Sequence, residues 1–161
     1  MHALSDLLLE AVVNSTEAGA REIAADIHLG NGIAVVTVVD DGRGPSVEPF
    51  TGLSTKGKGR GMGLRLIEER SGGKCSLKRE GDRTVLRFES PYDGSFDDPG
   101  DAFFPIFQAG RGIRLSIAGD IELVFSGSEI ESRGIDLERA DGISLFKETI
   151  RKMVRTRREN G

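Results

Sequence analysis

Cysteine and histidine are scarce in this chain. Cys75 is the single cysteine, and His2 and His28 are the only histidines. One cysteine cannot form an internal disulfide bond, and so few soft ligands give no cluster for a zinc site. Any bound metal is therefore expected to be a hard cation held by oxygen ligands.

Long hydrophobic runs are also missing. The sequence has no stretch of about 18 apolar residues that could span a membrane, and residues 1–6 have neither the basic start nor the apolar stretch of a secretion signal. We therefore expect no membrane partner and a cytoplasmic location. The net charge of -4 makes nucleic acid an unexpected partner for the molecule as a whole.

The 161 residues, of which 37% are hydrophobic, suffice for one ordinary domain or a small domain with a compact annex. Residues 92–100 are rich in Asp, Gly, Ser and Pro, a composition typical of a linker. We therefore predict a first domain over residues 1–91 and a C-terminal annex over residues 92–161.

Hydrophobic periodicity predicts an ordered set of elements in the first domain. Apolar residues at helical spacing indicate helices, and alternating or β-branched runs between glycine-rich turns indicate strands. The predicted order is a helix over residues 4–18, strands over 23–29 and 33–39, a long loop over 40–60, a helix over 61–70, and a hairpin over 74–80 and 83–90. The β-branched run at 33–39 suggests a deeply buried strand, and loops as long as 40–60 are usually functional.

The annex has an aromatic segment, a strand pair and a closing helix. Phe103, Phe104 and Phe107 are expected in the core, the strand pair over 113–125 turns at Gly119-Asp120, and the helix covers 143–158. This helix carries six basic residues, Lys147, Arg151, Lys152, Arg155, Arg157 and Arg158. They fit a docking face for an acidic partner or a nucleic acid, but a solvated helix end favoured by the helix dipole is the simpler interpretation.

Polar residues form a stripe along the first predicted helix. Asp6, Glu10, Asn14 and Glu17 recur at spacings of three or four residues, so their side chains share one face. When the helix is considered alone, a solvated face is the simpler explanation of this stripe.

Two glycine-rich segments follow. The buried strand runs into Asp40-Asp41-Gly42-Arg43-Gly44, where an acid can accept a hydrogen bond from an exocyclic amine and the glycines let a flat base approach the backbone. Residues 57–63 alternate glycine with other residues directly before a helix, a suitable place for phosphate. Each motif alone is weak, because Asp-x-Gly-x-Gly is often only a tight turn and the second segment matches no P-loop.

Together the three segments resemble the N, G1 and G2 boxes of the GHKL superfamily, which includes gyrase, heat-shock chaperone, histidine kinase and mismatch-repair ATPases. Residues 10–20 are similar to the N box of mismatch-repair proteins. Residues 48–50 with 54–56, and residues 59–64, resemble the F and G2 boxes of histidine kinases. This resemblance covers residues 4–91 and implies an α+β Bergerat fold, a two-layer α/β sandwich, here with a small α+β annex.

The resemblance implies ATP and Mg²⁺ as cofactors. Asn14 would hold magnesium through its amide oxygen, and Glu10 would orient or deprotonate the attacking group. Asp40 would accept the adenine amino group. The other residues that the resemblance assigns to the nucleotide are Ala18, Gly42, Gly44 and Thr84 around the base, and Lys56, Gly59, Gly61, Met62, Gly63 and Leu64 near the phosphates.

Some features depart from the kinase pattern. Met62 stands where leucine is more usual, and Arg83 stands where kinases often have a second glycine. The chain begins almost at the N box, so the helical hairpin with a phosphoacceptor histidine is not expected. More weakly, the layout resembles small stand-alone bacterial ATP-binding proteins found with iron hydrogenase genes.

Three functions are compatible with this pattern. The first is a slow ATPase that acts as a regulatory switch and reports to a protein partner through the annex. The second is a kinase that transfers phosphate in trans to a histidine or serine of a partner. The third is an ATP-sensing module without chemistry.

Overall fold

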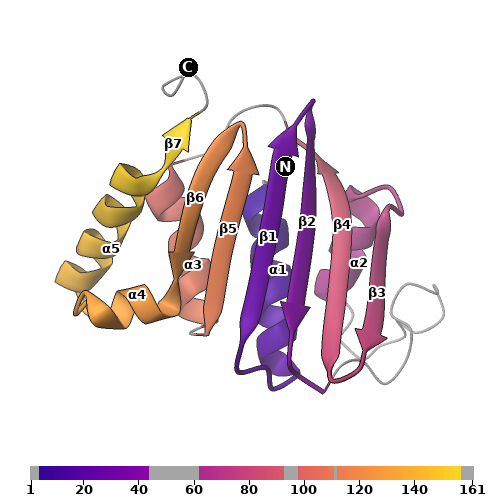
Figure 1. Ribbon diagram of the computed structural model, residues 1–161, viewed down its shortest axis with the longest axis horizontal. Helices are drawn as coiled ribbons and strands as arrows, with labels where there is room; N and C mark the ends of the chain where they lie inside the picture. The colour runs from indigo at the N-terminus through magenta and orange to yellow at the C-terminus, as the bar shows by residue number, and fades with distance from the viewer. Residues whose placement is uncertain (1–3, 44–61, 93–97, 111, 157–161) are drawn as a thin grey trace.

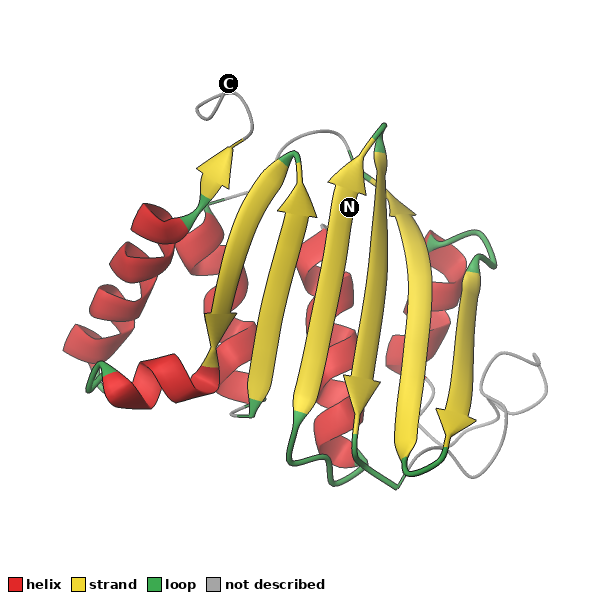
Figure 2. Cartoon of the chain, in the orientation of Figure 1, coloured by secondary structure: helices red, strands yellow, loops and turns green. Residues whose placement is uncertain are grey.

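The fold is a single sheet with helices on one face (Figure 1). The computed structural model describes residues 4–43, 62–92, 98–110 and 112–156, without the side chains of Met62, Gly63 and Thr156. The elements are α1 (Leu4–Glu17), β1 (Ile23–Gly30), β2 (Ile33–Asp40), α2 (Met62–Arg70), β3 (Cys75–Glu80), β4 (Arg83–Pro91), α3 (Pro99–Ala109), β5 (Ile113–Gly119), β6 (Ile121–Ser126), α4 (Gly127–Ser132), α5 (Ala140–Met153) and β7 (Arg155–Thr156). The predicted α+β, two-layer arrangement is confirmed (Figure 2).

The described strands form a seven-stranded sheet in the order β3-β4-β2-β1-β5-β6-β7. Neighbours are antiparallel except β1 and β5, which pair in parallel from Ile23 opposite Ile113 to Leu29 opposite Gly119. The predicted hairpins over 23–39 and 74–90 are confirmed. β1 therefore joins the strands of the first ninety residues to those of the annex.

Glycines at both ends of β5 allow its close approach to β1. A Cβ atom on Gly112 would collide with the carbonyl oxygen of Arg21, and one on Gly119 would collide with that of Leu29. Gly119 also has a φ of 107°, a conformation that side chains disfavour. The parallel pairing thus depends on two positions without side chains.

The side chains on the face of the sheet that the described helices cover are buried. In β2, Ala34, Val36 and Val38 are buried against the helices, whereas the alternating Val35, Thr37 and Val39 are only half-buried. The expectation of a deeply buried strand is therefore wrong for one of its faces, because the described helices cover only one face of the sheet. On α1, the leucines with Ala11 and Val12 face this core.

Phenylalanines build the core of the annex. The ring centroids of Phe107 lie 5.5 Å from those of both Phe125 and Phe146. Phe103 and Phe107 are buried as expected, while Phe104 is half-buried and its ring lies 5.5 Å from the Lys147 Nζ atom. The aromatic segment is helix α3, which begins after the N-cap Asp98 and packs against both α1 and α5.

The closing helix is shorter than predicted. α5 ends at Met153, and Val154 takes an extended conformation with a φ of -67° and a ψ of 131°. Arg155 then pairs with Glu122 of β6 as part of β7, so it does not extend a basic helix face. Arg157 and Arg158 lie outside the described residues. The expectation of a helix over 143–158 is wrong because pairing with the sheet edge ends it early.

The annex strands continue the sheet of the first domain. β5 and β6 follow directly on β1, so both parts share one hydrophobic core. The division at residue 91 stays a prediction of where a linker lies.

Candidate functional site

Four segments meet at one end of the sheet, the lower end in Figure 1. The C-terminal half of α1, the end of β2, the start of β4 and the first turn of α2 lie there. The side-chain hydroxyl of Ser15 on α1 donates to the Oδ2 atom of Asp40 at 2.7 Å, which ties helix to strand. The described parts of the predicted motifs therefore surround a common region.

Asp40 is the buried acid of this region. Only 3% of its surface is exposed. Its Oδ1 atom accepts the backbone N–H of Gly42 at 2.8 Å, and its Oδ2 atom accepts the Ser15 hydroxyl. A buried carboxylate needs such partners, since an unpaired one is costly. Both of these donors are neutral, and each carboxylate oxygen keeps a further lone pair for another donor.

The turn after Asp40 is packed tightly on the end of α1. A Cβ atom on Gly42 would lie 2.8 Å from the carbonyl oxygen of Ala18 and 3.1 Å from its Cβ atom. The backbone N–H of Arg43 donates to the same Ala18 carbonyl at 3.0 Å, and its Nη2 atom donates to the Glu17 carbonyl at 3.0 Å. Only glycine fits at position 42 in this arrangement.

Thr84 lies directly beside Asp40 on the neighbouring strand. The β2–β4 register pairs the two residues, and Thr84 is 3% exposed. The Nη1 atom of Arg79 donates to the Thr84 hydroxyl at 2.8 Å and also to the Gly42 carbonyl. Because the hydroxyl oxygen accepts this bond, its own proton can be donated elsewhere.

Asp41 holds the turn between α1 and β1. Its Oδ1 atom accepts the backbone N–H groups of Glu22 and Arg21, at 3.1 and 2.8 Å. The bond from Glu22, and to a smaller extent that from Arg21, lowers the pKa of Asp41 below its ordinary value of 3.8. Asp41 is therefore a structural neighbour of the buried acid.

The polar stripe of α1 is not uniform. Glu10 and Asn14, one helical turn apart, are half-buried, whereas Asp6 and Glu17 are exposed. A purely solvated face would expose the two middle members as well.

Within the described residues, no group of three or more His, Cys, Asp or Glu side chains could hold a metal ion.

The predicted phosphate side is only partly described. Gly44, Lys56, Gly59 and Gly61 lie outside the described residues. Met62, Gly63 and Leu64 form the first turn of α2, where backbone N–H groups have no partner within the helix. Leu64 is 4% exposed and belongs to the core, so its side chain is structural.

Sequence reasoning did not assign a role to Ser15 or Arg79. Ser15 is a polar residue on the buried side of α1, which is the signal that marks it. Arg79 lies opposite Thr84 in the β3–β4 register, a relation that a hairpin prediction could have given. The roles of all predicted site residues toward a nucleotide stay predictions.

The described half of the region combines a buried acid, a glycine and a hydroxyl group. Asp40 offers a buried acceptor for an exocyclic amine, Gly42 presents backbone without a side chain, and Thr84 offers a hydroxyl. Convergent polar groups of this kind are typical of ligand sites.

No helix in the described ranges has the length and apolar character needed to cross a membrane. None of the curated proteins compared with the chain matches it. The resemblance to ATP-binding proteins found with iron hydrogenase genes therefore stays without support.

A protein-family model does match, over residues 1–94. Its description is "Histidine kinase-, DNA gyrase B-, and HSP90-like ATPase". The matched residues include α1, β1, β2 and β4, which carry the buried acid and its neighbours. A family of this kind binds ATP, and the chain belongs to these histidine kinase-, DNA gyrase B- and HSP90-like ATPases.

Proposed function

We propose that this chain binds ATP with magnesium and hydrolyses it slowly, as a regulatory switch. The observation that carries the proposal is the buried carboxylate of Asp40, whose hydrogen-bond donors among the described residues are the neutral Ser15 hydroxyl and Gly42 N–H, and which lies beside Thr84. A carboxylate in this setting favours a ligand that brings an amine donor.

Asp40 would select adenine over guanine. Its carboxylate can accept the exocyclic amine of adenine, whereas guanine would present a carbonyl oxygen to the same position. Two acceptors facing each other in a buried pocket leave both without a hydrogen bond. Gly42 would let the base lie against the backbone, and Thr84 would donate its hydroxyl proton to a ring nitrogen.

Glu10 and Asn14 would act at the phosphate end. Magnesium, when bound, neutralises phosphate charge. The Asn14 amide oxygen is a suitable hard ligand for this ion, and the half-buried Glu10 carboxylate can orient a water molecule and accept its proton. α1 fixes the two side chains one turn apart on a helix that Ser15 holds to Asp40.

Calorimetry with ATP, ADP and GTP in magnesium tests nucleotide binding. We expect ATP to bind and GTP not to bind. Asp40→Asn should weaken ATP binding by about 1 to 3 kcal/mol, because one hydrogen bond to this side chain loses its acceptor. Asp26→Asn, which alters an exposed carboxylate on β1, is the matched control. Thermal unfolding checks that Asp40→Asn is folded. Unchanged ATP affinity in a folded Asp40→Asn protein would contradict the proposal.

Phosphate release tests the hydrolytic step. We expect slow turnover that Glu10→Ala abolishes while ATP binding persists. Turnover no higher than in Glu10→Ala would exclude the ATPase switch. Tight binding without any phosphate release would then support a sensing module.

A second candidate is phosphate transfer in trans. The feature that favours it is the histidine-kinase pattern of residues 48–64, rather than any described contact. Incubation of the chain with labelled ATP and a cell extract should then label one protein in a Glu10-dependent manner, and an unlabelled gel would count against transfer.

A further inference from the structure

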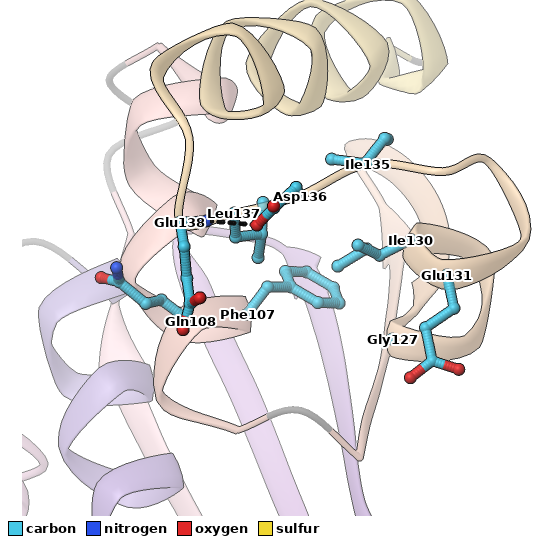
Figure 3. Close-up of a pocket in the computed structure, with 9 residues that line it drawn as sticks. All are labelled: Phe107, Gln108, Gly127, Ile130, Glu131, Ile135, Asp136, Leu137 and Glu138. Carbon is cyan, nitrogen blue, oxygen red and sulfur yellow. Dashed lines mark hydrogen bonds between the residues drawn. The ribbon is translucent and has the colours of Figure 1, made fainter.

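A hollow lies in the annex, away from the candidate nucleotide region. Its volume is about 260 Å³, and it is enclosed by the end of α3, by α4 and by residues 135–138 before α5 (Figure 3). Phe107, Ile130, Ile135 and Leu137 supply its apolar surface. These four residues are buried or half-buried, so the floor of the hollow belongs to the core.

Carboxylates surround this apolar surface. Glu131, Asp136 and Glu138 contribute to the lining, and no lysine or arginine is among the described lining residues. The Asp136 Oδ1 atom accepts the Glu138 backbone N–H at 2.9 Å, which shapes the segment itself. Figure 3 shows the Glu131 and Glu138 side chains on opposite sides of the Phe107 ring.

Size and charge together point to the occupant. The volume is below the range of about 300 to 1,000 Å³ that is usual for small-molecule sites, so a single side chain fits better than a whole ligand. Arginine buries its aliphatic stem along apolar surface and keeps its guanidinium at the rim, where carboxylates bind it. We propose that the hollow binds an arginine side chain on a segment of a partner protein.

The hollow is connected to the helix of the nucleotide site. The Thr16 hydroxyl on α1 donates to the Ala109 carbonyl at the end of α3 at 3.1 Å, two residues after Phe107. A Cβ atom on the adjacent Gly110 would lie 2.8 Å from a side-chain carbon of Val12. A partner at this place would therefore contact a helix that packs directly on α1. The proposal goes beyond nucleotide binding and does not depend on it.

A peptide titration of the ¹⁵N-labelled full chain, without nucleotide, tests this proposal. The probe is the blocked tripeptide acetyl-Leu-Arg-Leu-amide, and the comparison peptide has citrulline, which is neutral but similar in shape. We expect saturable amide shifts at Phe107, Ile130 and residues 135–138, with about fivefold weaker binding of the citrulline peptide because exposed charge pairs contribute modestly. No saturable shift there, or equal binding of both peptides, would overturn the proposal.

Matched double variants give the second test. Glu131→Gln with Glu138→Gln should weaken the arginine peptide about fivefold. Glu80→Gln with Glu122→Gln removes the same charge from exposed positions on β3 and β6 and should leave binding unchanged. An equal loss in both double variants would show a general charge effect and overturn the proposal. ATP calorimetry on the same proteins should give unchanged affinity, which keeps this test separate from that of the proposed function.

Discussion

Arg79 joins three parts of the candidate nucleotide region through one guanidinium group. It extends from β3 to the Thr84 hydroxyl on β4 and to the Gly42 carbonyl in the turn after β2. Because Gly42 in turn donates to Asp40, the orientation of the buried acid depends on a residue that we do not expect to contact the base. Arg79 is thus a positioning residue.

Arg79→Met should weaken ATP binding about fivefold, since a loss of roughly 1 kcal/mol is expected when one hydrogen-bonding partner is removed. Calorimetry measures the change, and Arg79→Lys should recover part of it. The control is Lys78→Met, which removes the neighbouring charge from the other face of β3. If both variants bind ATP equally well, Arg79 does not position the site.

The sequence indicated only part of this cluster. Asp40, Gly42 and Thr84 could be proposed because their types match the family pattern. Ser15 and Arg79 could not be assigned, since their importance comes from packing between elements: Ser15 reaches across 25 residues to Asp40, and Arg79 acts through strand register. A motif records residue types but not these tertiary partners.

At the scale of elements, the pairing of β5 with β1 should be disrupted when a side chain is added at a glycine beside the pairing. Gly119→Ala should destabilise the protein by about 1 to 3 kcal/mol more than Gly81→Ala, because its Cβ collides with the Leu29 carbonyl. Gly81 also has a positive φ, of 62°, but open space around it, so this control has no collision and a smaller conformational cost than a φ of 107° imposes. Urea unfolding measures the stability of both variants. An equal loss of stability in the two would contradict a role for the close approach of β5 to β1.

The contact between α3 and α5 should depend on pH. The Asp98 carboxylate accepts hydrogen bonds from the Nε and Nη2 atoms of Arg151, at 2.7 and 2.9 Å. These bonds hold the pKa of Asp98 below its ordinary value of 3.8. A lowered folded-state pKa gives stability that is present above pH 3.8 and is lost as the pH falls through the folded-state value.

Asp98→Asn should therefore lower the melting temperature at pH 6, and the difference from the wild type should shrink as the pH falls below 3.8. Glu148→Gln, on the same face of α5 but paired with Lys152, is the comparison. A difference that stays constant between pH 6 and pH 3 would contradict this assignment.

Elements with clear periodicity were predictable, and those defined by tertiary contacts were not. The helices at 4–18 and 61–70 and the three hairpins agree with the structure within a few residues. α3 was recognised only as an aromatic segment, because Pro105 and consecutive phenylalanines obscure its helical pattern. The end of α5 is set by pairing of Arg155 with β6, which helical periodicity cannot indicate.

At the scale of the whole molecule, residues 1–91 alone should not behave as a stable monomer. Such a fragment leaves the β1 edge without β5 and exposes the surface of α1 that α3 covers. Unpaired central strands associate with other chains. We expect light scattering after gel filtration to show oligomers of the fragment, with the full chain as control.

A monomeric fragment with cooperative unfolding would instead support residue 91 as an independent domain boundary. The linker composition of residues 92–100 could suggest a boundary, but composition gives no information about which strands later pair. The match of the family model to residues 1–94 likewise describes similarity rather than autonomous folding.

The parallel pairing also has a consequence for biosynthesis. Ile23 pairs with Ile113, so one edge of β1 has no partner strand until the intervening chain has left the ribosome. Contacts this distant in sequence form slowly, and a nascent chain with an open strand edge is prone to aggregation. The strands of residues 1–91 therefore leave the ribosome before the strand that completes their sheet, and the β1 edge is open to pairing with other chains during that interval.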